Sequence, residues 1–263
     1  MVKVVTINIL FDLQDWAERR ELLVQGLAAE QADLIALQEV KLPEDTSSWL
    51  AKQLDMPYVS LVPHHYPGQP GVPPHGLAIL SRYPFIQQAS LDLSGQGRRA
   101  HYVQIEIDHQ PIVLCNGHYY WAPGPAPERV KQIQQVLEWL GALPPDLPIV
   151  AVGDFNGEPQ NPAIVLMREH FTSAYAARHG HEPAYTCPTP LIRRGWRRIW
   201  KVILLNLKYN PTFRPWRGTL DYVFINRHLQ VNDCRIILDS PSPGDPTLYP
   251  SDHFGLAAEL RIV

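Results

Sequence analysis

Polar side chains stand at or near the ends of apolar runs, where buried strands do not require them. They are carboxylates, carboxamides and imidazoles: Asn8, Glu39, His118, Asp154, Asn156, Asp221, Asp252 and His253. If these ends meet at one rim, the carboxylates repel one another unless they hold a hard cation. Mg²⁺ or Mn²⁺ takes oxygen ligands and leaves places for water and phosphate. Because histidines can donate to phosphate oxygens or move protons, the set predicts metal-assisted phosphate chemistry.

The most informative stretch is AVGDFNGEP, residues 151–159. A strand over 147–156 would deliver Asp154 and Asn156 to one face, two residues apart, and Gly157 would let the chain turn away. An Asx turn that closes the strand at Asp154 is an equally open interpretation.

Four of the other residues also have a simpler explanation. Glu39 could be an exposed strand terminus, and His118 a hydrogen-bonded histidine of the core or rim. Asp252 and His253 could cap a turn after Pro250. Each residue alone is a weak signal, so the functional interpretation depends on the group of them occurring together at strand ends.

Apolar and β-branched runs predict strands, and apolar residues at helical spacing predict helices between them. The expected strands cover 2–10, 32–40, 58–62, 76–82, 101–108, 111–120, 147–156, 221–226, 234–239 and 254–263, and the expected helices 15–31, 44–54 and 126–141. Strands near 76–118 and 221–263 follow one another closely, as in antiparallel sheets. The predicted fold class is α/β, with two mixed sheets packed face to face and helices outside.

Length and composition fit one large domain over residues 1–263. The formal net charge is −3, which excludes a global basic field for nucleic acid. The three cysteines lack metal-ligand spacing and fit a reducing compartment. The N-terminal residues begin on a strand pattern without the shape of a signal peptide, so we expect a cytoplasmic protein.

Taken in order, the motifs of the chain resemble the endonuclease/exonuclease/phosphatase superfamily, whose best-known fold is that of deoxyribonuclease I. The matching stretches are TINI (6–9), QEV (38–40), GLAILSRYP (76–84), NGHYY (116–120), ERVKQ (128–132), GDFN (153–156), TLDYVF (219–224) and SDHFG (251–255). The resemblance covers essentially the whole chain, and the pairing of GDFN with a late SDH is its most specific part. It implies a four-layer α/β sandwich and a metal-dependent phosphohydrolase that usually uses Mg²⁺, with Mn²⁺ as a possible substitute.

The resemblance also implies roles at the metal. Glu39 would be the main metal ligand, and Asn8 would support the metal site directly or through water. Asp252 would be a ligand on the second side or would orient one. Arg129 and Gln132 match a family element that we interpret as structural.

The remaining residues take catalytic roles by the same resemblance. Asp154 would align or deprotonate the attacking water, and Asn156 would hold the nucleophile and the developing phosphoryl charge. His253 would contact the scissile phosphate, with Asp221 fixing its tautomer. His118 would donate to a phosphate oxygen or help the leaving group. These terms supply what phosphoryl transfer needs, namely charge neutralisation and a water in line.

One segment departs from the family pattern, an apparent insertion at about 190–217. No Asp or Glu occurs from Pro183 to Leu220, while basic residues are frequent there. Apolar residues recur at three- and four-residue spacing, which predicts a basic amphipathic helix over 193–208. This helix could grip a nucleic-acid backbone, lie in a lipid interface, or pack its apolar face on the core with its arginines solvated.

Aromatic residues near the expected site allow two interpretations. Tyr119, Tyr120 and Trp121 directly follow His118 and could stack on a base or sugar, or belong to the core. The loop over 63–75, with His64, His65 and Tyr66, could line a substrate groove or be a plain surface loop.

The leading prediction is an enzyme, a Mg²⁺-dependent phosphodiesterase or nuclease that cleaves nucleic acid. The alternative is a sphingomyelinase-like phospholipid hydrolase or an inositol-phosphate hydrolase at a membrane surface, with peripheral contact through 193–208. A non-catalytic binding module is disfavoured, because such a relative should have lost one of Glu39, Asp154, Asn156 or His253. No protein partner is predicted, and the sequence does not choose DNA over RNA.

Overall fold

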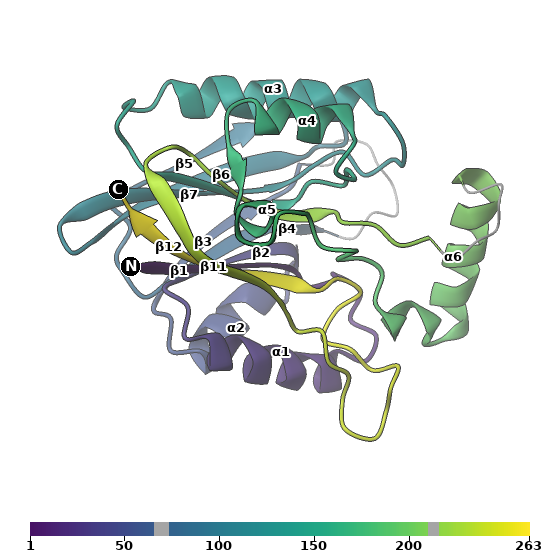
Figure 1. The fold of residues 1–263 in the computed structure, drawn as a ribbon. Coiled ribbons are helices and arrows are strands. Elements are labelled where there is room, and N and C mark those ends of the chain that lie inside the picture. Colours follow the sequence, from purple (N-terminus) through teal and green to yellow (C-terminus); the bar gives the residue numbers. More distant parts are fainter. Residues whose placement is uncertain (66–73, 210–215) are drawn as a thin grey trace.

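The computed structural model describes residues 1–65, 74–209 and 216–263. Its strands form two six-stranded sheets (Figure 1). The first has the order β11-β12-β1-β2-β4-β3, with bounds Leu229–Ile237, Gly255–Ile262, Val2–Asn8, Leu34–Lys41, His75–Ser81 and Tyr58–Pro63. The second has the order β5-β6-β7-β8-β10-β9, with bounds Gln87–Asp92, Arg99–Ile107, Gln110–His118, Ile149–Asp154, Asp221–Ile225 and Thr172–Ser173.

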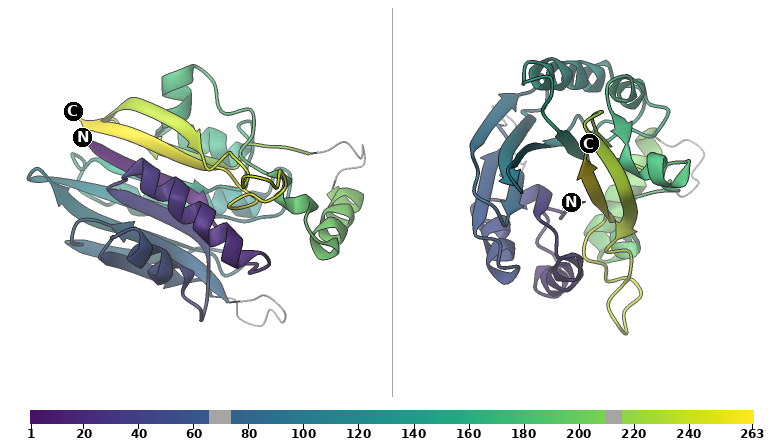
Figure 2. Two further views of the ribbon diagram at one scale, coloured as in Figure 1. Left: turned by 90° about the horizontal axis from the view of Figure 1, so that it is seen from below. Right: turned by 60° about the vertical axis from the view of Figure 1, so that its left-hand side comes forward.

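Apolar side chains from both sheets meet in a buried core, which includes Val4 and Leu34 of the first sheet and Leu114 and Val152 of the second. Helices α1 (Trp16–Glu30) and α2 (Thr46–Gln53) cover the outer face of the first sheet. Helices α3 (Pro127–Gly141) and α4 (Pro162–Arg168) cover that of the second, and the layers are seen edge-on in Figure 2. The predicted sandwich of two mixed sheets with helices outside is therefore confirmed.

The same local unit occurs once in each sheet, and it positions the site. β1 runs through α1 into the parallel strand β2, and β7 runs through α3 into the parallel strand β8. The carboxyl ends of parallel strands meet at one edge of a sheet, where ligands of open α/β folds bind. The register places Asn8 beside Gln38 and His118 beside Asp154.

Two antiparallel strands bring further polar residues to this edge. β10 pairs antiparallel with β8, so its first residue Asp221 lies opposite Asp154. β12 pairs antiparallel with β1, and Asp252 and His253 lie just before its start.

The predicted strand over 147–156 is wrong at its carboxyl end. β8 stops at Asp154, and Asn156 has a φ of 51°, in the left-handed region. Strand alternation therefore does not place Asn156. The turn does so instead, because the Asn156 N–H donates to Asp154 Oδ1 at 2.9 Å.

Several elements were not expected from the sequence. β5 is an edge strand whose half-polar run QQASLD carries little apolar signal. Short elements over 162–193 were also missed: α4, β9, α5 (Ala174–His179) and the 3₁₀ turn η1 (Pro190–Arg193). The expected helix of the insertion is α6, Trp196–Tyr209. Figure 1 shows it standing off the sandwich.

Candidate active site

Asn8, the last residue of β1, links the two sheets. Its Nδ2 donates to Glu39 Oε1 at 3.3 Å and to Asp154 Oδ2 at 3.1 Å. Its Oδ1 accepts from the Leu10 N–H. The side chain is buried, so this amide fixes the distance between a carboxylate of the first sheet and one of the second.

A β-bulge turns Glu39 toward the site. The pairing of β2 with β4 shifts register between Gln38 and Val40, and Glu39 has a φ of 59°. A bulge re-aims a side chain that regular alternation would place elsewhere. Gln38 remains between the sheets, where its Nε2 donates to Asn116 Oδ1 at 2.8 Å. Glu39 Oε2 accepts from the Phe11 N–H at 3.1 Å, which holds the carboxylate at the rim.

The two carboxylate oxygens of Asp154 have different surroundings. Oδ1 closes the Asx turn, whereas Oδ2 lies 3.1 Å from Asn8 Nδ2 and 3.5 Å from His118 Nε2. Burial raises the pKa of Asp154 to about 7, although nearby His253 acts to lower it. A carboxylate with such a pKa suits proton transfer at neutral pH. The Asx turn is therefore present, and the catalytic role of Asp154 Oδ2 stays a prediction.

Gly153 permits the close approach of β7 and β8 behind this carboxylate. Its φ is +137°, and a Cβ there would lie 1.9 Å from the carbonyl oxygen of Gly117. Any side chain at position 153 would push apart the strands that carry His118 and Asp154.

His253 is held as a cation by carboxylates. Its Nδ1 donates to Asp221 Oδ2 at 2.9 Å, and Thr186 Oγ1 donates to the same oxygen at 2.6 Å. Burial acts to lower the pKa of His253, but Asp221, with Cys187 and Asp154, raises it well above its ordinary value. The Nε2–H of the imidazolium lies 3.8 Å from Asp154 Oδ2. Asp221 therefore occupies the orienting position that the resemblance implied.

His118 is neutral and its tautomer is set by Arg98. The Arg98 guanidinium, which only donates, lies with Nη1 2.9 Å from His118 Nδ1. Nδ1 is thus an acceptor, and the proton is on Nε2, which faces Asp154. Burial and then Arg98 lower the pKa of His118 well below its ordinary value. A neutral and a cationic imidazole therefore both present Nε2–H groups near Asp154 Oδ2.

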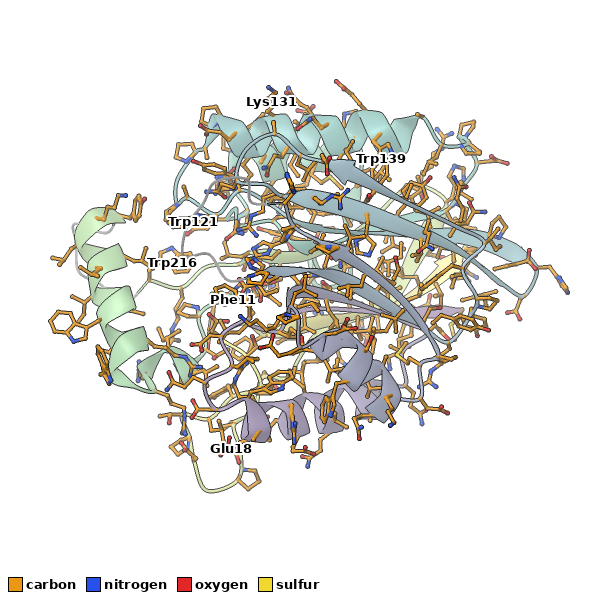
Figure 3. The ribbon with its side chains drawn as sticks, turned by 180° about the vertical axis from the view of Figure 1, so that it is seen from behind. Phe11, Glu18, Trp121, Lys131, Trp139 and Trp216 are labelled. Atoms are coloured by element: carbon orange, nitrogen blue, oxygen red, sulfur yellow. The ribbon has the colours of Figure 1, made fainter. Side chains whose placement is uncertain are left out.

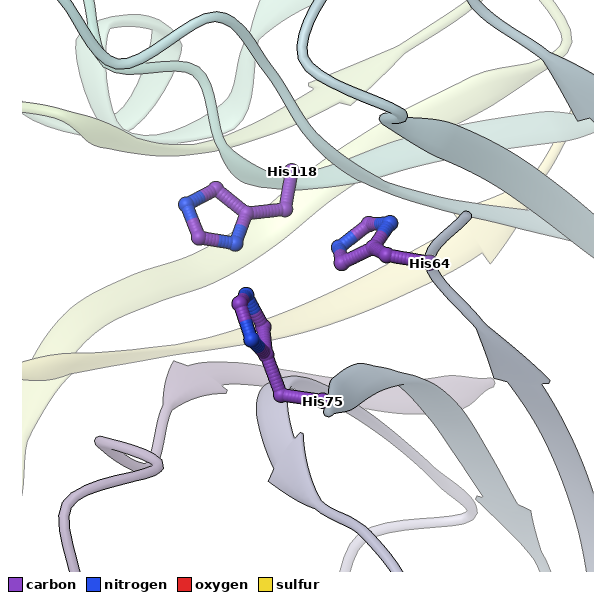
Figure 4. Close-up of side chains that lie close together, drawn as sticks. All are labelled: His64, His75 and His118. Atoms are coloured by element: carbon purple, nitrogen blue, oxygen red, sulfur yellow. The ribbon is translucent and has the colours of Figure 1, made fainter. Parts of the chain in front are cut away.

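Two further histidines pack around His118, as Figure 4 shows. The ring centroids of His64 and His75 lie 5.8 and 6.4 Å from that of His118, and all three side chains are buried. His75 also stacks on Phe11 at 4.7 Å, beside the backbone that holds Glu39. His64 was expected either to line a groove or to belong to a plain surface loop, and its burial excludes the surface position. His75 was not foreseen. The only signal for His75 was its place directly before the GLAILSRYP motif. Tyr66 lies outside the described residues.

Among the described residues, two groups of side chains are close enough to share an ion: His64, His75 and His118, and Asp154, Asp221 and His253. Glu39 and Asp252 belong to neither. Asp252 is half-buried, and its carboxylate lies 3.4 Å from Ser251 Oγ. Asp252 as a second metal ligand remains a prediction.

The oxygen donors at Glu39 fit Mg²⁺. This ion is commonly held by one or two carboxylates, with waters and substrate phosphate completing its octahedron. Asn8 presents its amide nitrogen, not its oxygen, to Glu39. Of the two roles expected for Asn8, the arrangement fits indirect support of the metal site better than direct ligation.

The segment after His118 is fixed by α3. Arg129 donates to the carbonyl oxygens of Tyr120 and Gly124, and Gln132 Oε1 accepts from the Tyr120 N–H at 2.7 Å. Tyr119 is buried and packs on Phe155 with a centroid distance of 4.7 Å, so it belongs to the core. Trp121 is exposed at the rim.

The family model described as "Endonuclease/Exonuclease/phosphatase family" matches residues 5–253. This chain belongs to that family. Curated proteins that are similar to this chain include nocturnin of Homo sapiens, which is 25% identical over 93% of this chain and 58% of the relative. Protein angel of Drosophila melanogaster is 22% identical over 70% of this chain and 54% of the relative. The chain thus spans about half the length of these curated relatives.

Two solved structures share the fold. The human nocturnin catalytic domain with bound sulfate anion superposes with a TM-score of 0.75 and 22% identity, covering 100% of this chain and 93% of that one. D. rerio TDP2 complexed with single-strand DNA product gives a TM-score of 0.75 and 16% identity, covering 99% and 98%.

Proposed function

We propose that this family phosphoesterase is a Mg²⁺-dependent phosphodiesterase that cleaves nucleic-acid strands by in-line attack of water. The observation that carries the proposal is the Asn8 bridge. One buried amide contacts both Glu39 and Asp154, and the two imidazole Nε2 groups lie beside the second of these carboxylates.

In this proposal Glu39 holds the metal, which neutralises phosphate charge when bound. Asp154, with a pKa raised to about 7, takes the proton of the attacking water. Asn156 Nδ2 donates to the Tyr119 carbonyl, which leaves the amide oxygen to orient that water. His253, as a cation, and His118, as a neutral donor, stabilise charge on the phosphoryl and leaving-group oxygens.

Nucleic acid is the favoured substrate because D. rerio TDP2, of the same fold, is complexed with single-strand DNA product. Exposed Trp121 follows the segment after His118 and offers a stacking surface for a base. A phospholipid or inositol phosphate is the second candidate, and the observation that favours it is the exposed apolar face of α6.

The test is cleavage of end-labelled single- and double-stranded DNA and RNA oligonucleotides, beside radiolabelled phospholipid vesicles and inositol phosphates. Each substrate is incubated with Mg²⁺, with EDTA and with the Glu39→Ala variant. Mg²⁺-dependent oligonucleotide cleavage that the variant lacks supports the nuclease. Turnover of the lipid or inositol phosphate alone supports the second candidate, and no turnover of any diester contradicts the proposal.

A further inference from the structure

Helix α6 exposes large apolar side chains to solvent. Trp196 is 67% and Leu204 61% exposed. The exposed set is Trp196, Ile199, Trp200, Ile203, Leu204 and Leu207. Their spacing of three and four residues places them on one face of the helix. Such a face is normally packed on a core, and a contiguous exposed one marks an interaction surface.

The opposite side of the helix is fastened to the body by charge. Arg198 is buried, with Nη1 3.1 Å from Asp15 Oδ2 and Nε 3.3 Å from Asp12 Oδ2. Arg194, just before the helix, pairs with Asp15 and Asp245. Of the three interpretations left open for this helix, the one with an apolar face packed on the core and solvated arginines is therefore wrong. The ion pairs of Arg194 and Arg198 hold one side of the helix against the body. The apolar face, on the opposite side, therefore points to solvent.

The segment that carries this face is basic, and exposed aromatic side chains lie beside it. Lys208 is exposed, and the chain has no Asp or Glu from Pro183 to Leu220. Trp216 and Trp121 are also exposed, and Figure 3 shows both on the side of the body that faces α6. Lys and Arg beside Trp and Leu are the composition of helices that lie in a lipid interface.

Other occupants fit this face less well. A nucleic-acid strand presents phosphates and bases but no surface that would cover the aliphatic side chains of Ile199, Ile203 and Leu204. Arg194 and Arg198, moreover, are engaged with aspartates. A second copy of the chain would bring two segments that lack acidic residues against each other, with like charges opposed. No helix among the described residues is long and apolar enough to cross a bilayer. The face therefore fits the surface of a membrane rather than its interior.

We propose that α6 is a docking helix for an anionic lipid surface. Its apolar face inserts among the headgroups, and the exposed basic residues Arg193 and Lys208 meet the lipid phosphates. The ring centroid of Tyr209, at the end of the helix, lies 6.3 Å from that of Trp121 in an edge-to-face contact. Docking would thus bring the rim that holds His118 close to the membrane. This inference goes beyond phosphodiesterase activity and does not require it.

The test is flotation of the purified chain with phosphatidylcholine vesicles, with and without phosphatidylserine, at low and high salt. The test variant is Trp196→Ser/Trp200→Ser/Leu204→Ser. The matched control is Ile86→Ser/Val165→Ser, which removes exposed apolar side chains from other elements. We expect binding to anionic vesicles that weakens at high salt, falls by about tenfold or more in the triple variant, and is unchanged in the control.

Circular dichroism establishes that each variant is folded, and light scattering in solution gives the mass of each. Glu39→Ala protein should float like wild type, because docking does not need catalysis. The flotation result therefore tests the docking proposal even if the enzyme proposal fails. Equal flotation of wild type and triple variant overturns the inference. So does a wild-type dimer that the triple variant dissociates, or an oligonucleotide affinity that falls in the triple variant while flotation does not.

Discussion

The rim of the sandwich and helix α6 depart from ordinary burial in opposite directions. At the rim, Asn8, Asp154, Asp221 and His253 are buried polar groups joined by hydrogen bonds. On α6, tryptophan and leucine side chains face solvent while an arginine is buried. Both arrangements cost stability in a lone folded chain, so both point to function. The rim carries the residues for which catalytic roles are proposed, and α6 carries the face that is proposed to dock on a membrane.

The largest expected effect is at the rim. Asp154→Asn keeps the size of the side chain but removes the proton acceptor, so kcat should fall by about 10³-fold or more. The measurement is hydrolysis of bis(p-nitrophenyl) phosphate with Mg²⁺, with the thermal midpoint confirming the fold. A fall of less than about tenfold would show that Asp154 is not the base.

Asp221→Asn should have a smaller effect, a fall in kcat of about 10- to 100-fold, because His253 loses the carboxylate that fixes its tautomer and charge. Thr186→Val is the matched comparison, since it removes one hydrogen bond to Asp221 and keeps the charge. We expect the kcat of Thr186→Val to lie between that of wild type and that of Asp221→Asn. Equal rates in all three proteins would contradict the orienting role.

Buried histidines of the body should make the fold sensitive to acid. Burial lowers the pKa of His101 to about 3. Below pH 6.5 the unfolded chain takes up a proton that the folded chain does not. Stability is therefore lost as the pH falls from about 6.5 toward 3, by up to about 1.4 kcal/mol per pH unit for this group. His101→Gln should reduce the slope of the free energy of unfolding, measured by urea denaturation, against pH between pH 6.5 and pH 5. An unchanged slope would contradict the role of His101 in acid sensitivity.

The smallest expected effect concerns the fastening of α6. Arg198→Ala should lower the free energy of unfolding by only about 1 kcal/mol, because its partners Asp12 and Asp15 keep contact with solvent and α6 adds little to the core. Hydrogen exchange of the α6 amides should nevertheless accelerate, whereas the exchange rates of the β7 and β8 amides should not change. Arg178→Ala, which removes a more exposed pair with Asp233, is the control. Faster exchange throughout the body would mean that α6 is part of the core.

The sequence predicted which residues gather at the rim better than it predicted how the backbone brings them there. Residue types are constrained by the chemistry, so Glu39, Asp154 and His253 could be selected without coordinates. Their placement depends on local backbone that periodicity does not describe. The bulge at Glu39 and the turn at Asn156 are both left-handed positions of ordinary residues.

The contacts that a residue makes in the fold were harder to predict than its chemical type suggested. Arg98 and His75 carry no motif, and only the pairing of distant strands brings them to His118. The period of α6 predicted an apolar face, but a period does not say whether that face is covered. Three aspartates far away in sequence, Asp12, Asp15 and Asp245, decide which side of the helix faces the body.

The most direct test of the rim as a metal-dependent site is the rate of bis(p-nitrophenyl) phosphate hydrolysis against Mg²⁺ concentration. Wild type, Glu39→Ala and Glu18→Ala are compared, the last being a carboxylate in the first turn of α1. We expect saturable Mg²⁺ dependence in wild type and Glu18→Ala, abolition by EDTA, and a loss of about 10²-fold or more in Glu39→Ala. Equal rates in wild type and Glu39→Ala, or hydrolysis that persists in EDTA, would contradict a metal site at Glu39.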